Sequence, residues 1–416
     1  MFNLLKKRGI TFLSFSNTIS QLGDRLTHMV IITLIGIMSP GRISAFSEFS
    51  VAFTLPIIVL APFAGVIIDH YNKQKIMLRC HLIQAVLIFL TPMLVMLTHS
   101  TLPIWILVVL FFSLDLFNNT SRNALVPDLV EHNELVQANS LITTFARVAT
   151  FIGMVGGGYL VHSVGWQIGF YIDASTHFIA GILVLGMGAR ILFEPVKRLE
   201  FSLSRELKKS FNRFLLDLKE LGILLIKDRI VVFVMLSVFI LPFVAAVSYT
   251  VLIYLVQQEF GMGTMGVGWL GGIIGVGMLI GGLLMGFFGK SVNRGKMIIC
   301  GMAVLAVFFL IGSVFVNVIF LYIVSVVAGI VFSIIGISQD TILQEDVLKE
   351  IRGRIFATKE FVINVTFILC AVFIGIISNN MKPHAIILGI GVFLCLVSGL
   401  AVLIYLSIPA DTRTKL

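Results

Sequence analysis

Long apolar stretches alternate along the chain with short intervals in which the charged residues gather. A helix needs about 20 mostly apolar residues to cross the hydrocarbon core of a bilayer, and stretches of that length recur too often for one buried core to hold them. The pattern predicts twelve membrane-spanning helices, six before and six after a longer polar interval. The predicted spans are 10–38, 43–68, 76–97, 102–126, 136–161, 166–192, 230–256, 266–289, 297–316, 319–343, 355–377 and 385–408.

The composition indicates a membrane protein rather than a soluble domain. Hydrophobic residues make up 58% of the 416 residues and charged residues only 12%, whereas a soluble surface needs far more charged side chains. We therefore expect an all-α polytopic membrane protein. The first span is too long for a cleavable signal peptide and contains Gln21, Asp24 and Arg25, so we expect it to be retained.

Lysine and arginine residues fall almost entirely on one side of the predicted membrane. Only Arg42 and Lys382 lie in intervals on the other side. Because cytoplasmic loops are enriched in these residues, we expect both termini and the interval 193–229 in the cytoplasm, with the protein in the cytoplasmic (inner) membrane. The net charge of +9 then reflects topology, and this alternation offers no basic face for a nucleic acid.

The two halves of the sequence repeat each other after the second and eighth spans. The residues that align at one constant shift are Gly65, Asn72, Lys73 and Lys75 with Gly286, Asn293, Arg294 and Lys296. Random basic loops would share charge but not the position of a glycine, so the repeat indicates a duplicated transporter architecture. We predict two pseudo-symmetric six-helix bundles, 1–192 and 230–416, joined by a cytoplasmic linker, 193–229, with an interfacial helix.

A polar stripe runs along one face of the first span. Its members, at spacings of four, three and four, are Asn17, Gln21, Asp24 and His28. An ionisable residue near the middle of a bilayer is costly and usually faces a bundle interior or a wet cavity, so Asp24 is a candidate functional residue. Either its carboxylate binds and releases a proton during transport, or it forms a permanent ion pair with Arg25, Arg122 or Arg147.

Further polar residues lie within the fourth, fifth and sixth spans. Asp115 belongs to a stripe on the fourth span, Arg147 lies on the fifth, and Asp173 with His177 gives the sixth a polar edge. Comparable charges are scarce in the seventh, eighth, ninth and twelfth spans, so we expect the proton-coupling residues in the first half. This asymmetry favours a hydrophobic or amphipathic substrate over a sugar or a polyanion.

The end of the second span carries the most specific motif of the chain. It reads Ala61-Pro-Phe-Ala-Gly65-Val-Ile-Ile-Asp69-His-Tyr-Asn-Lys73-Gln-Lys75 and resembles the loop signature of the major facilitator superfamily. The resemblance implies that Gly65 allows close approach of helices and that Asp69 latches one access state as part of a gate. Lys73 and Lys75 either belong to this gate or only signal topology. Lys290 stands where Asp69 would recur in the second half.

Motifs elsewhere are similar to those of one branch of that superfamily. They are Ser20-Gln-Leu-Gly-Asp24, Arg122-Asn-Ala-Leu-Val-Pro-Asp128, Glu134-Leu-Val-Gln-Ala-Asn139, Asp173-Ala-Ser, Leu343-Gln-Glu345 and Arg352-Gly-Arg354. The branch holds proton-coupled exporters of drugs, macrolides and siderophores, and the lysophospholipid flippases share much of the pattern. Arg122, Glu345, Arg352 and Arg354 are thereby assigned to the gating motifs.

Together these features predict a secondary transporter in which two bundles rock around a central cavity. We expect export of a drug-like amphipathic compound by proton antiport, performed by a monomer without a cofactor and without enzymatic activity. A nucleotide site is not expected, because Gly289-Lys-Ser291 follows a helix rather than a strand. The alternatives are transport of a lysophospholipid or a siderophore and, from another class, a receptor or scaffold that kept the fold without transporting.

Overall fold

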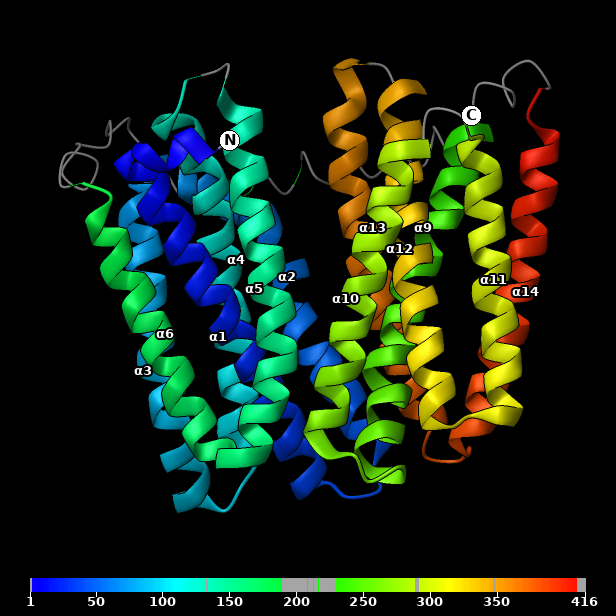
Figure 1. The fold of residues 1–416 in the computed structure, drawn as a ribbon, viewed down its shortest axis with the longest axis horizontal. Helices are drawn as coiled ribbons and strands as arrows, with labels where there is room; N and C mark the ends of the chain where they lie inside the picture. Colours follow the sequence, from blue (N-terminus) through cyan, green and yellow to red (C-terminus); the bar gives the residue numbers. More distant parts are fainter. Residues whose placement is uncertain are drawn as a thin grey trace. The chain divides into compact units, whose positions relative to one another are not determined.

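The computed structural model describes residues 2–131, 134–188, 208, 212, 216, 229–288, 292–346 and 349–409. These residues form long helices, and no strand occurs among them (Figure 1). The helices of the first half are α1 (Arg8–Met38), α2 (Ile43–His70), α3 (Lys73–Thr98), α4 (Leu102–Leu129), α5 (Leu135–Val164) and α6 (Trp166–Gly186), preceded by a short 3₁₀ helix, η1 (Phe2–Lys6). The second half contains α9 (Arg229–Val247), continued by the π-helical segments η3 (Ser248–Leu252) and η4 (Leu255–Glu259), then α10 (Gly263–Phe288), α11 (Arg294–Phe315), α12 (Val318–Asp346), α13 (Lys349–Ile377) and α14 (Pro383–Ser407).

Each predicted span coincides with one of these long helices, and the predicted all-α fold is confirmed. Eleven of the described helices are long and apolar enough to cross a membrane. The helix α1 falls outside this set, although it is 31 residues long, because its polar stripe lowers its mean hydropathy. The ends differ where a helix continues into polar sequence, as α13 does by beginning at Lys349 rather than at residue 355. The predicted linker helix lies almost entirely outside the described residues.

The chain divides into two compact units. The first comprises Met1–Pro40, Ala52–Asn212 and Met262–Trp269, and the second comprises Gly41–Val51, Arg213–Gly261 and Leu270–Leu416. The two units thus differ from the predicted halves, 1–192 and 230–416, because the start of α2 groups with the second unit and the start of α10 with the first.

In the first unit, α1 packs against α5 and α6, and α3 packs against α4 and α6. The helix α3 buries polar side chains and exposes apolar ones, the opposite of a surface helix in a soluble protein. Its inner face buries Gln74, His81 and Gln84, whereas Val86 and Phe89 on its outer face are more than half exposed. A helix with an apolar outside and a polar inside suits a lipid environment, in which the inner polar groups need partners from neighbouring helices.

Glycines set a close contact between α10 and α12 in the second unit. A Cβ atom added to Gly281 would lie 3.0 Å from the Cα of Ile330, and one added to Gly329 would lie 3.0 Å from the Cα of Gly277. Small residues let membrane helices approach this closely, which increases the van der Waals contact between them. Packing of this kind stabilises a bundle whose outer surface is as apolar as its core.

Candidate functional site

A cavity of about 390 Å³ lies within the first unit, bordered by α1, α4 and α5. Most of the residues predicted for proton coupling and substrate binding line it, namely Asn17, Gln21, Asp24, His28, Asp115 and Arg147. The remaining one, Asp173 of α6, is fully buried and does not line the cavity. The polar stripe of α1 therefore faces a cavity inside its own unit rather than lipid.

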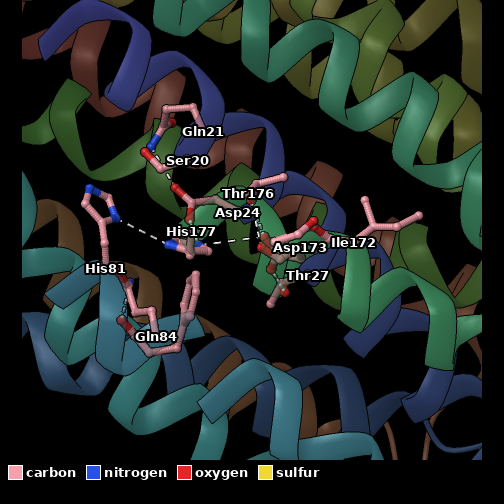
Figure 2. A network of polar contacts seen from close by, with 12 residues as sticks. Ser20, Gln21, Asp24, Thr27, His81, Gln84, Ile172, Asp173, Thr176 and His177 are labelled. Atoms are coloured by element: carbon pink, nitrogen blue, oxygen red, sulfur yellow. Dashed lines mark hydrogen bonds and ion pairs between the residues drawn. The ribbon is translucent and has the colours of Figure 1, made fainter. Parts of the chain in front are cut away.

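Asp24 connects this cavity to a network of buried polar side chains (Figure 2). The residue lies halfway along α1 and is only 6% exposed. Gln21 Nε2 donates a hydrogen bond of 2.7 Å to Asp24 Oδ2, and Nε2 of His177 on α6 lies 3.3 Å from Asp24 Oδ1. Among the described residues, its ion-pair partner is therefore this histidine and none of the three arginines that the sequence offered.

His177 lies between two carboxylates. Its Nε2 is 3.7 Å from Oδ1 of Asp173 as well as 3.3 Å from Asp24, and its Nδ1 lies 3.4 Å from Nδ1 of His81 on α3. Asp173 also accepts hydrogen bonds from Thr27 Oγ1 and, at 3.0 Å, from Thr176 Oγ1. Nε2 of His177 thus lies within ion-pair distance of both carboxylates.

This arrangement can hold a variable number of protons. When Asp24 is ionised, a protonated imidazole at His177 has two counter-charges. When Asp24 takes up a proton, Asp173 still balances that imidazole, so no buried cation is left without a partner.

Gly23 allows α1 and α6 to approach closely enough for these contacts. A Cβ atom at this position would collide with Oδ1 of Asp173 and with Oγ1 of Thr176. In the motif that ends in Gly23-Asp24, the glycine thus leaves space for the side chains of α6, and the aspartate contacts His177 on the same helix. Any larger residue at position 23 must push α6 or its polar side chains away.

Three arginines, Arg25, Arg122 and Arg147, line the cavity. Arg122, assigned from the sequence to the gating motifs, lines the cavity and donates from Nη1 to Oδ1 of Asn17. Arg25 lines the cavity as well, and its buried Nε has no hydrogen-bond partner in the described part of the chain. Arg147 lies on the α5 side. In the described ranges, none of the three forms an ion pair with a carboxylate.

The residues of the repeated loop form the same contacts in both halves. Asn72 and Asn293 each cap the following helix by accepting a hydrogen bond from the backbone N–H of Lys75 and Lys296, respectively. Lys73 Nζ then lies 2.7 Å from Asp128 Oδ2 at the end of α4, and Arg294 Nη1 lies 2.6 Å from Glu345 Oε2 at the end of α12. Both loops thus tie the start of one helix to the end of the next.

The remaining residues predicted for the gate are Gly65, Asp69, Arg352 and Arg354. The side chains of Asp69, Arg352 and Arg354 lie outside the described residues. A Cβ atom on Gly65 would meet nothing within 4 Å among the described atoms. At the start of α5, a hydrogen bond from Lys7 lowers the pKa of Glu134, which links the beginning of α1 to the beginning of α5.

Sequence reasoning missed the residues that complete the network. The spacing of Asp173 and His177 indicated a polar edge on α6 but not that this edge contacts Asp24. The helical spacing of Gln74, His81 and Gln84 marks a polar face on α3, and Thr27 lies next to His28 of the α1 stripe. Neither pattern shows which helix these side chains contact. In the second unit, the buried Lys359 of α13 pairs with Asp340 of α12, a contact that the sequence also did not predict.

Comparison with known proteins identifies a family. The model of the Major Facilitator Superfamily matches residues 13–263 and 234–416. BacE of Bacillus subtilis (strain 168), which is named as a bacilysin exporter, is 26% identical over 328 residues, covering 77% of both chains. Macrolide efflux protein A of Enterococcus faecalis is 24% identical over 311 residues, covering 73% of this chain and 91% of its own.

Solved structures show the same fold. The nucleoside transporter NupG superposes with a TM-score of 0.73 at 12% sequence identity, covering 96% of this chain and 98% of its own. A bacterial homologue of the iron transporter ferroportin, in an inward-facing state, gives a TM-score of 0.70 at 12% identity and covers 95% of this chain and 98% of its own. At these identities the likeness concerns architecture only.

Replacing Gly23 by alanine is expected to lower the free energy of unfolding by about 1 to 3 kcal/mol, because the methyl group overpacks the α1–α6 contact. Thermal unfolding of the purified protein measures the effect. The matched control is Gly156→Ala on α5, where the methyl group meets nothing within 4 Å and helix propensity improves. Equal melting temperatures for Gly23→Ala and the parent protein would contradict the close contact.

Proposed function

The chain belongs to the Major Facilitator Superfamily and is a membrane transporter rather than an enzyme, and we propose that it exports an amphipathic small molecule in exchange for protons. The observation that carries the proposal is Asp24, a buried carboxylate that contacts His177 behind it and lines the cavity in front of it. The direction of transport is supported by relatives that are named as an exporter and as an efflux protein.

Two properties of Asp24 favour a proton carrier over a structural ion pair. First, it lines the cavity, so a proton that reaches the cavity has access to it. Second, its partner His177 keeps Asp173 as a second counter-charge, so that neutralising Asp24 leaves no cation unbalanced. A carboxylate that only neutralised an arginine would lie within ion-pair distance of that arginine.

Transport then follows from competition for the cavity. Substrate binds when Asp24 is ionised, and a proton that enters from the other side of the membrane displaces the substrate. One access state therefore favours bound substrate and the other favours a bound proton. A receptor or scaffold that kept the fold has no need of a titratable group at this position. The exchange of a proton at Asp24 therefore separates the transporter from that alternative.

We propose that the loops after α2 and α10 form the gate on the cytoplasmic side. The ion pairs Lys73–Asp128 and Arg294–Glu345 join neighbouring helix ends in both halves, which supports a role beyond topology for these cations. Asp69, at the end of α2, would add the latch that the second half lacks. Both termini lie in the cytoplasm, and the protein resides in the cytoplasmic membrane as a monomer.

Replacing Asp24 by asparagine is expected to abolish proton-driven export while the protein stays folded, because the amide has the same shape and forms hydrogen bonds but does not titrate. Growth of a deletion strain on a panel of toxic amphiphiles identifies a substrate, and proteoliposomes with a pH gradient then measure its flux. The control is Glu48→Gln, which removes an exposed carboxylate paired with Arg42. If Asp24 instead neutralised Arg25, Arg122 or Arg147, the same change would leave that buried arginine unbalanced and cost roughly 3 to 5 kcal/mol. Full proton-coupled flux in Asp24→Asn would rule out the carrier role.

Replacing Asp69 by asparagine is expected to weaken one access state without unfolding the protein, since the change removes one charge at a helix end. Single cysteines placed on either side of the membrane report the shift through their rates of labelling. A variant that matches the parent protein in both labelling and transport would show that Asp69 is no latch.

Reporter fusions test the topology. An enzyme active only in the cytoplasm is expected to give signal when fused after Leu416, because the lysine and arginine residues retain that side of the protein in the cytoplasm. A matched fusion of a reporter active only outside the cytoplasm should stay silent. Strong signal from the second fusion would overturn the predicted orientation.

A further inference from the structure

Charged residues of both signs line the cavity of the first unit. Arg25, Arg122 and Arg147 contribute guanidinium groups, and Asp24 and Asp115 contribute carboxylates. Each charged side chain within a membrane-spanning helix is costly. A binding site for a purely hydrophobic compound would gain nothing from these five charges, so the cavity is suited to a ligand that is itself charged.

Arg25 and Arg147 line the cavity, and in the described ranges neither forms an ion pair with a carboxylate. Arg122 is engaged by the amide oxygens of Asn17 and Asn123, whereas the buried Nε of Arg25 has no hydrogen-bond partner among the described groups. Arg147 is exposed, although it lies within a membrane-spanning helix. Among the described residues, Asp115 and Arg25 do not form an ion pair. Guanidinium groups bind a planar carboxylate through paired hydrogen bonds.

The two carboxylates of the cavity offer a site for a cation. Asp24 of α1 and Asp115 of α4 both line the cavity. An ammonium group placed between two carboxylates is attracted by both, and a proton on either carboxylate weakens that attraction. The proton and the ammonium group of the substrate then compete for the same carboxylates. Antiport requires such competition between the two transported species.

An apolar wall completes the cavity. Phe111 and Phe112 of α4 line it, with ring centroids 5.3 Å apart, and His28 of α1 stands edge-on to Phe112 at 5.2 Å. Rings in this arrangement bury the apolar body of a ligand while its charged groups reach the aspartate and arginine side chains.

We propose that the substrate is an amphipathic zwitterion, whose ammonium group binds between Asp24 and Asp115 and whose carboxylate binds Arg25 and Arg147. Its chemical class is that of an amino acid or short peptide with an apolar side group. This inference rests on the proposed export function and names the substrate class of the same cavity.

Three fluorescent probes with one apolar body separate the two charges. Nε-dansyl-lysine carries both the ammonium and the carboxylate, its Nα-acetyl derivative carries only the carboxylate, and its carboxamide carries only the ammonium. Dansyl fluorescence in the purified full-length protein measures the dissociation constants. The zwitterion is expected to bind roughly tenfold tighter than either derivative, since each hydrogen-bonded charge contributes on the order of that factor.

Arg147→Gln is expected to weaken binding of the zwitterion and the acetylated probe about tenfold and to leave the carboxamide unchanged. Arg147→Lys, which keeps the charge but loses the paired hydrogen bonds, should fall between the two. The control Arg42→Gln removes an exposed arginine that is not among the residues lining the cavity and should change none of the three. Melting temperatures of all variants show whether the fold is kept.

The proposal is overturned if the carboxamide binds as tightly as the zwitterion, if Arg147→Gln weakens all three probes equally, or if the parent protein binds none of them. The assay uses no proton gradient. Its failure therefore leaves the test of proton-coupled flux untouched, and a failure of that test leaves these affinities interpretable.

Discussion

The close contact between α1 and α6 is the constraint on which the candidate site depends. Asp24, Asp173 and His177 carry charge inside a membrane-spanning bundle, where an unbalanced charge is strongly destabilising. Gly23 lets α6 approach closely enough for His177 Nε2 to lie 3.3 Å from Asp24 Oδ1 and 3.7 Å from Asp173 Oδ1. Thr27 and His81 then occupy the remaining polar positions around this contact. The same contact holds Asp24 at the cavity wall. The residues that stabilise the α1–α6 contact therefore include the residue proposed to exchange the proton.

Sequence periodicity predicted the parts of this site that lie on one helix. The spacing of Asn17, Gln21, Asp24 and His28 gave a single face, and the cost of polar groups in lipid indicated that this face meets a cavity, as it does. The partners on other helices were not predictable in the same way. Asp24 was matched with arginines because opposite formal charges attract, yet the structure supplies His177, whose charge depends on the partners it meets. His81 shares a helical face with Gln74 and Gln84, but only the packing of α3 on α6 shows that it meets His177.

The two units have the same loop contacts, but their interiors differ. Each loop between the paired helices caps the second helix with asparagine and ties it to an acidic residue, Asp128 or Glu345. The first unit adds the charged cavity, whereas the second packs α10 on α12 through glycines and buries Lys359 against Asp340. Duplication thus explains the common loops, and the unequal placement of charge explains why proton exchange and substrate charge are both assigned to the first unit.

The account depends most on the titration of Asp24, and infrared spectroscopy observes protonated carboxyl groups directly. The parent protein, titrated in detergent without substrate, is expected to show a carboxylic-acid band that disappears as the pH rises. The difference between the parent and Asp24→Asn isolates the contribution of this one residue from those of Asp115 and Asp173. A titrating band that is absent from the variant supports the account. Identical titration spectra for the two proteins would contradict it.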